Sequence, residues 1–348
     1  MAGASEALVD DSTPGADGRP LSIMVPMLNE AAHVADLVAD LASQDYEGEL
    51  EVLVADGGST DGSPELLLEA AQRAGITITL LDNPGRIVSP GLNACIRRAT
   101  GDLIVRLDCH ARYPSDYLTR SVEAVGETGA WLVGGRILPA GRTPIERAVA
   151  CATDGPFGGA HWKLEGETPE PVEVDTVSLG IYRAEAFERA GLFDEELVRD
   201  QDEEIALRIR LSGGRVFYDS RIRSHYVPRG SYSGAFKQYY EYGFWKVPVM
   251  LKHRRVTSGR SLAPVAFVAS LLALGAAAPW SRTARSLLAA EVGAYAASGI
   301  AFGALSIRAR GESARLLPAV AAVFPTVHVA FGLGFLGGCV RALRRRDV

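Results

Sequence analysis

The segment from residue 21 to residue 137 alternates short apolar runs with amphipathic stretches, and this alternation limits the folds open to the chain. The runs that read as strands span 21–28, 49–56, 76–81, 102–108 and 131–137. The segments with helical periodicity are 31–43, 64–74 and 91–100. Strands separated by helices of this length predict an α/β fold with a parallel, Rossmann-like sheet. Polar clusters follow these strands, at the edge where such sheets bind ligands.

Charge and hydrophobicity divide the chain into two parts. From Ser231 onward there are 15 Lys and Arg against 4 Asp and Glu, whereas the preceding part has 21 against 38. The basic part holds apolar segments at about 262–280, 285–307 and 316–340, each near the ~20 residues that cross a bilayer. We therefore expect attachment to a membrane and no nucleic-acid partner.

The number of membrane crossings is open at this point. The basic clusters KHRR, before the first apolar segment, and RALRRR, after the last, both favour the cytosol. Three crossings would separate these clusters, so one segment is expected to be re-entrant or interfacial. The last segment, broken by Pro325 and carrying His328, is the candidate. The alternative is that all three are helices of a soluble core.

Four regions are expected. Residues 1–20, rich in Ala, Asp, Gly and Pro, read as a disordered leader, and residues 21–230 as the α/β domain. Residues 231–260 carry aromatic and basic side chains that suit an amphipathic interfacial helix, with core packing of the aromatics as the alternative. Residues 261–348 form a transmembrane helical region. The four cysteines show no metal-type pairing, which fits a reducing compartment.

Several ordered motifs carry a family resemblance. VADGGSTDGS ends the second strand, RLDCHARYP ends the fourth, and RDQDEEIALRIR lies further along the chain. With PMLNE, NPGRIVSPGLN and QYYEYGFWK, these motifs resemble family 2 glycosyltransferases of the GT-A fold, most of all the ExoA-like glucosyltransferases of succinoglycan and related exopolysaccharide assembly. The similarity runs from about Leu21 to Lys252. It implies a GT-A catalytic domain followed by a helical membrane region.

The resemblance places the nucleoside beside the first two strands. Asp56 matches the family's base-reading aspartate, since a carboxylate at a strand end can accept a hydrogen bond from a uracil N–H. Its alternative role is to cap the turn through the glycines that follow it. Asp61 is explained equally well as a turn-stabilising carboxylate. Pro26, Asn29 and Glu30 would line the nucleoside site.

Three further residues are assigned to nucleotide-sugar binding. Arg86, in the loop NPGRIVSPG, could pair with the diphosphate through its planar fork, although a plain surface arginine is the alternative. Asn93 belongs to the same motif and is placed in the donor site with it. Gly180, between the metal motif and the candidate base, would permit close approach of a sugar.

The diphosphate of a nucleotide-sugar donor suggests a bound divalent cation. A divalent cation between carboxylate and phosphate oxygens neutralises the charge of a departing diphosphate. Family members place a DxD motif there, and this chain has Asp108, Cys109 and His110. We expect Asp108 and His110 to bind Mn²⁺ or Mg²⁺, with the imidazole favouring Mn²⁺. His110 could instead donate a neutral hydrogen bond to the diphosphate, and Cys109 reads as a small apolar residue against the sheet.

Inversion at the anomeric carbon needs a general base for the acceptor hydroxyl. DQDEEIALRIR resembles the family's ED-x-E-L helix start, with Gln201 in place of the more usual Glu and Asp202 as the base. Glu204 could simply form a surface ion pair with Arg208, at i, i+4. The rival bases within one turn are Asp200, Glu203 and Glu204.

Together these features predict an inverting glycosyltransferase. By resemblance it would move glucose from UDP-glucose onto a lipid-linked saccharide acceptor. We expect a multi-pass protein of the inner or plasma membrane, with its catalytic domain in the cytosol. Two alternatives stay open: transfer to a polyprenyl phosphate itself, and a non-catalytic membrane scaffold.

Overall fold

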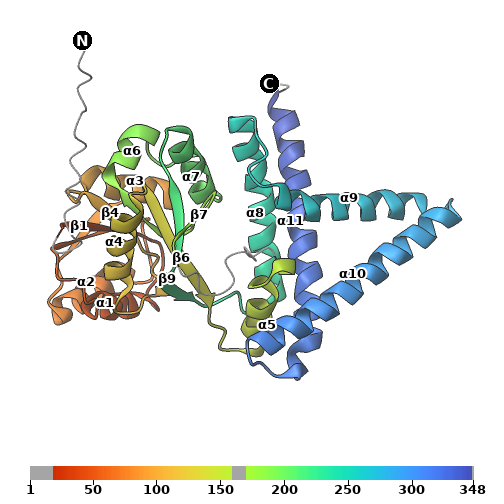
Figure 1. Ribbon diagram of the computed structural model, residues 1–348, viewed down its shortest axis with the longest axis horizontal. Helices are drawn as coiled ribbons and strands as arrows, with labels where there is room; N and C mark the ends of the chain where they lie inside the picture. The colour runs from red at the N-terminus through yellow and green to blue at the C-terminus, as the bar shows by residue number, and fades with distance from the viewer. Residues whose placement is uncertain (1–18, 159–169, 347–348) are drawn as a thin grey trace, which may run out of the picture.

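The computed structural model describes residues 19–158 and 170–346, so the expected leader lies outside the described residues apart from its last two positions (Figure 1). The strands are β1 (Leu21–Met27), β2 (Leu50–Asp56), β3 (Ile78–Asp82), β4 (Leu103–Arg106), β5 (Ala111–Arg112), β6 (Leu132–Pro139), β7 (Val172–Glu173), β8 (Gly180–Arg183) and β9 (Val216–Tyr226). The helices beside the sheet are α1 (Val34–Ala42), α2 (Ser63–Ala74), α3 (Val88–Arg98), α4 (Tyr117–Thr128), α6 (Ala184–Ala190) and α7 (Gln201–Leu211). The remaining α-helices are α5 (Pro144–Thr153), α8 (Tyr232–His253), α9 (Leu262–Ala277), α10 (Arg282–Ala309) and α11 (Leu317–Arg346).

The strands form one sheet in the order β3-β2-β1-β4-β8-β6-β9-β5, and β7 pairs with β9. β1 is parallel to β2 and β4, and β2 is parallel to β3. β8 is antiparallel to both β4 and β6. The expected Rossmann-like arrangement is therefore found in β1–β4, and the later strands make the sheet mixed. The carboxyl ends of β1, β2 and β4 meet at one edge, together with the motifs that follow them.

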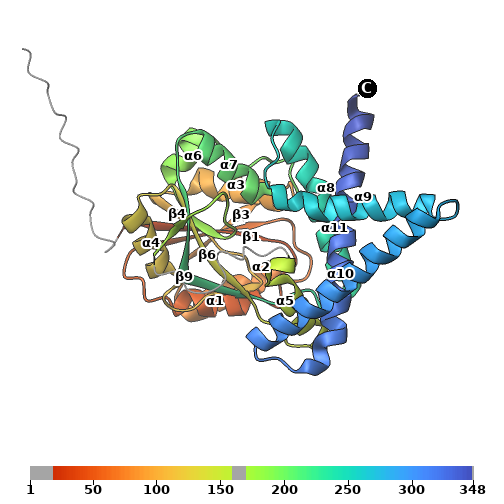
Figure 2. The same ribbon diagram turned by 45° about the vertical axis from the view of Figure 1, so that its right-hand side comes forward.

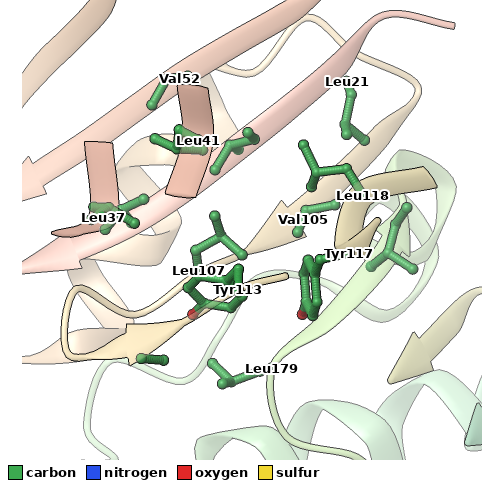
Figure 3. Packing of buried hydrophobic residues seen from close by; sticks show 14 of the residues in the cluster. Leu21, Leu37, Leu41, Val52, Val105, Leu107, Tyr113, Tyr117, Leu118 and Leu179 are labelled. Carbon is green, nitrogen blue, oxygen red and sulfur yellow. The ribbon is translucent and has the colours of Figure 1, made fainter. Parts of the chain in front are cut away.

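Both faces of the sheet are covered. Ile23 and Val25 of β1 join a core that includes α1 and α4, whereas Met24 joins a core with α3, α6 and α7. This alternation follows from the two-residue period of a strand. Figure 3 shows Leu37 of α1 and Leu118 of α4 in the first core. Because helices cover both faces, the open part of the sheet is its edge.

α8 and α11 pack with their backbones in contact. A Cβ on Gly243 of α8 would lie 2.0 Å from the carbonyl oxygen of Phe331, and one on Gly334 of α11 would lie 2.0 Å from the carbonyl oxygen of Tyr240. Such close approach is possible only where one partner lacks a side chain, as at many helix interfaces in membranes. The glycines of α11 therefore hold it against α8.

Three helical segments are long and apolar enough to cross a membrane: Gly259–Ala277, Arg282–Ala309 and Ala314–Arg344. The third runs through Pro325 without interruption, which corrects the expected break. Nearly half of its apolar window, 44%, is buried inside the protein, against 6% and 11% for the first two. α9 and α10 thus present their apolar surfaces outward, whereas α11 is partly covered.

α5 lies between β6 and β7 in the sequence but packs on the C-terminal helices. Ala148 and Ala152 of α5 share a core with Val320 and Phe324 of α11. The cap residue Asp154 also binds Arg310 at 2.5 Å. This short helix joins the α/β domain to the membrane region.

Gly243→Ala tests the α8–α11 contact. In an open helical position, Ala stabilises by about 1 kcal/mol relative to Gly. At Gly243 we expect the opposite sign, because overpacking costs about 1–3 kcal/mol and should lower the melting temperature in detergent by several degrees. The matched control is Gly293→Ala in α10, where a Cβ meets no atom within 4 Å. Equal melting temperatures for the two variants would show that the contact does not stabilise the protein.

Candidate active site

The carboxylate of Asp56, at the end of β2, stabilises the turn that follows it. Asp56 accepts hydrogen bonds from the backbone N–H of Gly58 at 3.2 Å, the backbone N–H of Ser59 at 3.1 Å and the hydroxyl of Ser59 at 2.6 Å. Asp61 likewise accepts from Ala31 N at 3.0 Å. Both carboxylates therefore perform the turn-capping role considered above, and contact between Asp56 and uracil stays a prediction.

The loop after β1 is tied to the same turn. Asn29 has a left-handed backbone, with φ of 56°, and its side-chain oxygen accepts from Thr60 N at 2.9 Å. Glu30 N donates to the hydroxyl of Ser63 at 2.7 Å. Pro26 is half-buried inside β1. These contacts form a continuous wall at the carboxyl ends of β1 and β2.

Arg86 lies next to the turn that follows β2. Its backbone is left-handed, with φ of 62°, and its Cα is 3.3 Å from the place where a Cβ on Gly57 would be. The exposed side chain makes no hydrogen bond or ion pair with any residue in 19–158 or 170–346. Its guanidinium is available to an anion.

Two residues that were assigned to donor binding contact other parts of the chain in the structure. Asn93 is 1% exposed, and its amide donates to Phe193 O at 2.9 Å and to Glu195 at 2.8 Å. Gly180 lies inside the sheet, where a Cβ would be 2.7 Å from the carbonyl oxygen of Val133. Asn93 therefore holds a loop against α3, and Gly180 permits close approach of β6. Contact of either residue with the donor stays a prediction.

Arg106 connects the two predicted acidic positions. It ends β4, and its side chain is only 5% exposed. Its Nε and Nη2 donate to the two carboxylate oxygens of Asp108 at 3.1 and 3.3 Å, and its Nη1 donates to Asp202 Oδ1 at 2.5 Å. The structure thus brings Asp108 and Asp202 onto one guanidinium, although they are 94 positions apart.

Sequence reasoning missed Arg106. The available signal was an arginine at the end of an otherwise apolar strand, since a charge is buried only where it has partners. Burial raises the pKa of Asp202, and the guanidinium of Arg106 counters part of that rise. Asp202 Oδ2 accepts no hydrogen bond from the described residues, so this oxygen is open to a proton.

His110 faces the β1 loop. Its Nδ1 lies 3.2 Å from a carboxylate oxygen of Glu30, and this hydrogen bond raises the pKa of His110. In the neutral form with its proton on Nδ1, the ring keeps a lone pair on Nε2 that can bind a cation. Cys109 is 2% exposed and packs in the core, as predicted.

The residues around Asp108 suit a cation that is shared with a substrate. Among the described residues, no three His, Cys, Asp or Glu side chains cluster as a metal-binding group. Asp108 and His110 offer one carboxylate and one imidazole. Divalent cations in nucleotide sites commonly take only one or two protein ligands and complete their shell with phosphate oxygens and water. The donor set therefore fits such a cation.

The rival bases are bound to α8. Asp200 begins α7 with a left-handed backbone, φ of 62°, and burial raises its pKa to about 6 although Lys246 opposes the shift. Lys246 lies 3.4 Å from Asp200 and also contacts Glu203. Both carboxylates are paired with a lysine, whereas Asp202 pairs with Arg106 beside the metal motif.

The ion pair considered as an alternative for Glu204 and Arg208 is present but does not lie at the surface. The pair exists, at 2.7 Å, but the side chain of Glu204 is 0% exposed. Glu204 also binds Lys252 at 2.8 Å and His253 at 2.9 Å. Burial by itself would raise the pKa of Glu204, but hydrogen bonds from Arg208, Lys252 and His253 lower it to about 2. The carboxylate of Glu204 therefore has a structural role, because it links α7 to the end of α8.

Backbone strain marks the same edge. Among the described residues, five other than glycine have a positive φ, and they are Asn29, Arg86, Leu179, Asp200 and Arg254. The first four lie in the loops described above or directly before β8. Such conformations cost about 1–3 kcal/mol each and cluster at functional sites.

The chain is similar in sequence to several known proteins. The model of the family "Glycosyl transferase family 2" matches residues 22–169. The chain is 30% identical over 326 residues to the succinoglycan biosynthesis protein ExoA of Rhizobium meliloti (strain 1021), covering 90% of this chain and 93% of that protein. It is 26% identical over 233 residues to a dolichyl N-acetyl-alpha-D-glucosaminyl phosphate 3-beta-D-2,3-diacetamido-2,3-dideoxy-beta-D-glucuronosyltransferase of Methanococcus voltae, covering 64% of this chain and 71% of that enzyme.

A solved structure shares the fold. The mannosyltransferase PcManGT from Pyrobaculum calidifontis, in complex with GDP-Man and Mn²⁺, superposes with a TM-score of 0.61 at 22% identity, covering 90% of this chain and 87% of that one. The GT-A fold expected from the motifs is thereby confirmed. The family match, the extent of the 30% identity and the shared fold together show that the chain belongs to glycosyltransferase family 2.

Proposed function

We propose that the edge formed by Arg106, Asp108 and Asp202 is the active site of an inverting, metal-dependent glycosyltransferase. The observation that carries the proposal is the single buried guanidinium that binds both carboxylates. It holds the group beside the donor diphosphate and the group that receives the acceptor proton next to each other. Direct displacement needs both groups around one anomeric carbon.

The donor would occupy the edge between the β1 and β2 loops and Arg86. Pro26, Asn29 and Glu30 wall the nucleoside, and Asp56 stays the candidate for the base. The guanidinium of Arg86 has no partner among residues 19–158 and 170–346, and its planar fork matches phosphate oxygens. Glu30 has a second task, because its carboxylate orients the imidazole of His110.

Asp108 and His110 would hold a divalent cation, Mn²⁺ or Mg²⁺. When bound, the cation neutralises charge on the departing diphosphate. Arg106 keeps the carboxylate of Asp108 oriented and shares its negative charge. Asp202 takes the proton of the acceptor hydroxyl through Oδ2, while Oδ1 stays bound to Arg106.

The proposed donor is UDP-glucose and the proposed acceptor a lipid-linked saccharide. The relative from Rhizobium meliloti is named for succinoglycan biosynthesis, and the relative from Methanococcus voltae is named for transfer to a sugar on dolichyl phosphate. Three apolar helices beside the catalytic domain would keep such an acceptor near the site. We place the enzyme in the inner or plasma membrane, with the catalytic domain in the cytosol.

The donor and the metal can be identified together. Detergent-purified protein is offered a panel of UDP- and GDP-sugars with Mn²⁺, Mg²⁺ or EDTA, and release of the nucleoside diphosphate is measured. We expect release from one donor, its loss in EDTA, and its loss in Asp108→Asn because the metal carboxylate is removed. Asp175→Asn, at a 71% exposed side chain, is the matched control and should keep full activity. Absence of both turnover and nucleotide binding would favour the non-catalytic scaffold.

Asp202→Asn distinguishes the two possible acceptors. Loss of a general base should lower kcat by about 10²–10⁴-fold while donor binding is kept. A polyprenyl phosphate is already anionic and needs no base. Substantial activity of Asp202→Asn with a polyprenyl phosphate acceptor would therefore contradict the saccharide acceptor and support direct transfer to the lipid.

Arg106 is proposed to act by positioning the two carboxylates. Arg106→Met should lower kcat by about 10²-fold, the usual effect of a misplaced reacting group, with little change in the Kd for UDP. Arg106→Lys keeps the charge but loses the fork, so we expect only partial rescue. The double variant with Asp202→Asn should lose less than the two single losses combined, because the part of the effect that acts through Asp202 is already gone. Additive losses, or a loss of UDP binding as large as the loss of kcat, would contradict a positioning role.

A further inference from the structure

α8 and α11 run in the same direction. The hydroxyl of Tyr232, at the start of α8, reaches the carbonyl oxygen of Ala319 at 3.4 Å. Further along, the guanidinium of Arg341 lies 5.4 Å from the ring centre of Phe244 and 5.3 Å from that of Trp245. The C-terminal ends of the two helices therefore lie together, as both views show (Figures 1 and 2).

This arrangement brings the two basic clusters to one end of the helix pair. Arg254 and Arg255 directly follow α8, and Arg341 and Arg344 lie at the end of α11. α8 itself is bound to the catalytic domain, because its Lys246 is buried between Asp200 and Glu203. α11 packs along α8, so it stays on the catalytic side together with both clusters.

α9 and α10 form a hairpin that projects from this pair on the side away from the sheet (Figure 2). The segment Gly259–Ala277 has 19 residues, which at 1.5 Å per residue gives about 28 Å, close to the ~30 Å of a hydrocarbon core. Large apolar side chains are exposed along both helices, among them Leu272 at 55%, Ile300 at 52% and Leu305 at 63%.

Polar groups inside the hairpin are paired with each other. Ser270 of α9 donates to the carboxylate of Glu291 of α10 at 2.9 Å. The rings of Phe267 and Tyr295 stack at 4.3 Å between the same helices. A carboxyl group in a lipid-facing helix is tolerated when it faces a partner helix with a hydrogen-bond donor.

The distribution of charge indicates how the hairpin is oriented across the bilayer. Its base carries Arg254, Arg255 and Arg260 before α9 and Arg308, Arg310 and Arg315 around the end of α10, whereas its tip carries only Arg282 and Arg285. Arginine-rich flanks remain in the cytosol. Trp280 at the tip is 86% exposed, and tryptophan prefers the interface between membrane and water.

We propose that the chain crosses the bilayer twice, through α9 and α10 only. The tip at residues 278–281 then lies on the far side, and the α8–α11 pair lies at the cytosolic face, with its exposed apolar surface against the lipid. The catalytic domain, both basic clusters and the C-terminus share one side. This topology rests on contacts and charges alone and does not depend on the proposed reaction.

Cysteine accessibility tests the topology in the full-length protein. Trp280→Cys and the matched control Val256→Cys, at a side chain 53% exposed before α9, are each expressed in a bacterial host. Spheroplasts are treated with a membrane-impermeant maleimide, and labelling is measured above that of the unmodified chain. We expect Trp280→Cys to be labelled in intact spheroplasts and Val256→Cys only after permeabilisation.

A C-terminal fusion to green fluorescent protein should fluoresce, because that protein matures in the cytosol.

Two results would overturn the proposal. If Trp280→Cys reacts only after permeabilisation, the hairpin does not reach the far side. If the C-terminal fluorescent fusion is dark while a fusion to periplasmic alkaline phosphatase at the same position is active, α11 crosses as well. Neither result involves glycosyl transfer, so failure of the proposed function leaves this test unaffected.

Discussion

The guanidinium of Arg106 is the contact on which the candidate active site depends. It is buried at the end of β4 and binds Asp108 and Asp202, so it joins the central sheet to the start of α7. A buried arginine needs such partners, and removing one partner of a buried pair destabilises by about 3–5 kcal/mol. The same requirement keeps the metal motif and the candidate base at a constant separation before any substrate arrives.

α8 extends this constraint to the apolar C-terminal helices. One side of the helix reaches α7 through Lys246, Lys252 and His253, which bind the acidic residues next to Asp202. The other side meets α11 at Gly243, where the backbones touch. The position of the candidate base relative to the apolar helices is therefore determined by one helix. This helix is bound through polar side chains on one side and through close packing on the other.

Much of the fold could be predicted because the relevant signals are local. The alternation of apolar runs and amphipathic stretches gave the order of β1–β4 and α1–α3, since strand and helix periods are properties of neighbouring residues. The antiparallel insertion of β8 between β4 and β6 has no such signal, because strand order is decided by contacts between distant segments. Asn93 and Gly180 were assigned to the donor by their motifs, and their neighbours Phe193 and Val133 could be seen only in three dimensions.

The sequence by itself determined the family, the types of residue that the proposed chemistry needs, and the apolar lengths that suit a bilayer. Those properties depend on residues that are close together in the sequence. Only the tertiary structure decided that Arg106 joins Asp108 to Asp202, that Glu204 is buried, and that α11 lies along α8. A buried charge or a helix contact depends on which distant residue supplies the partner, and the free energy of that choice comes from desolvation and packing across the whole molecule.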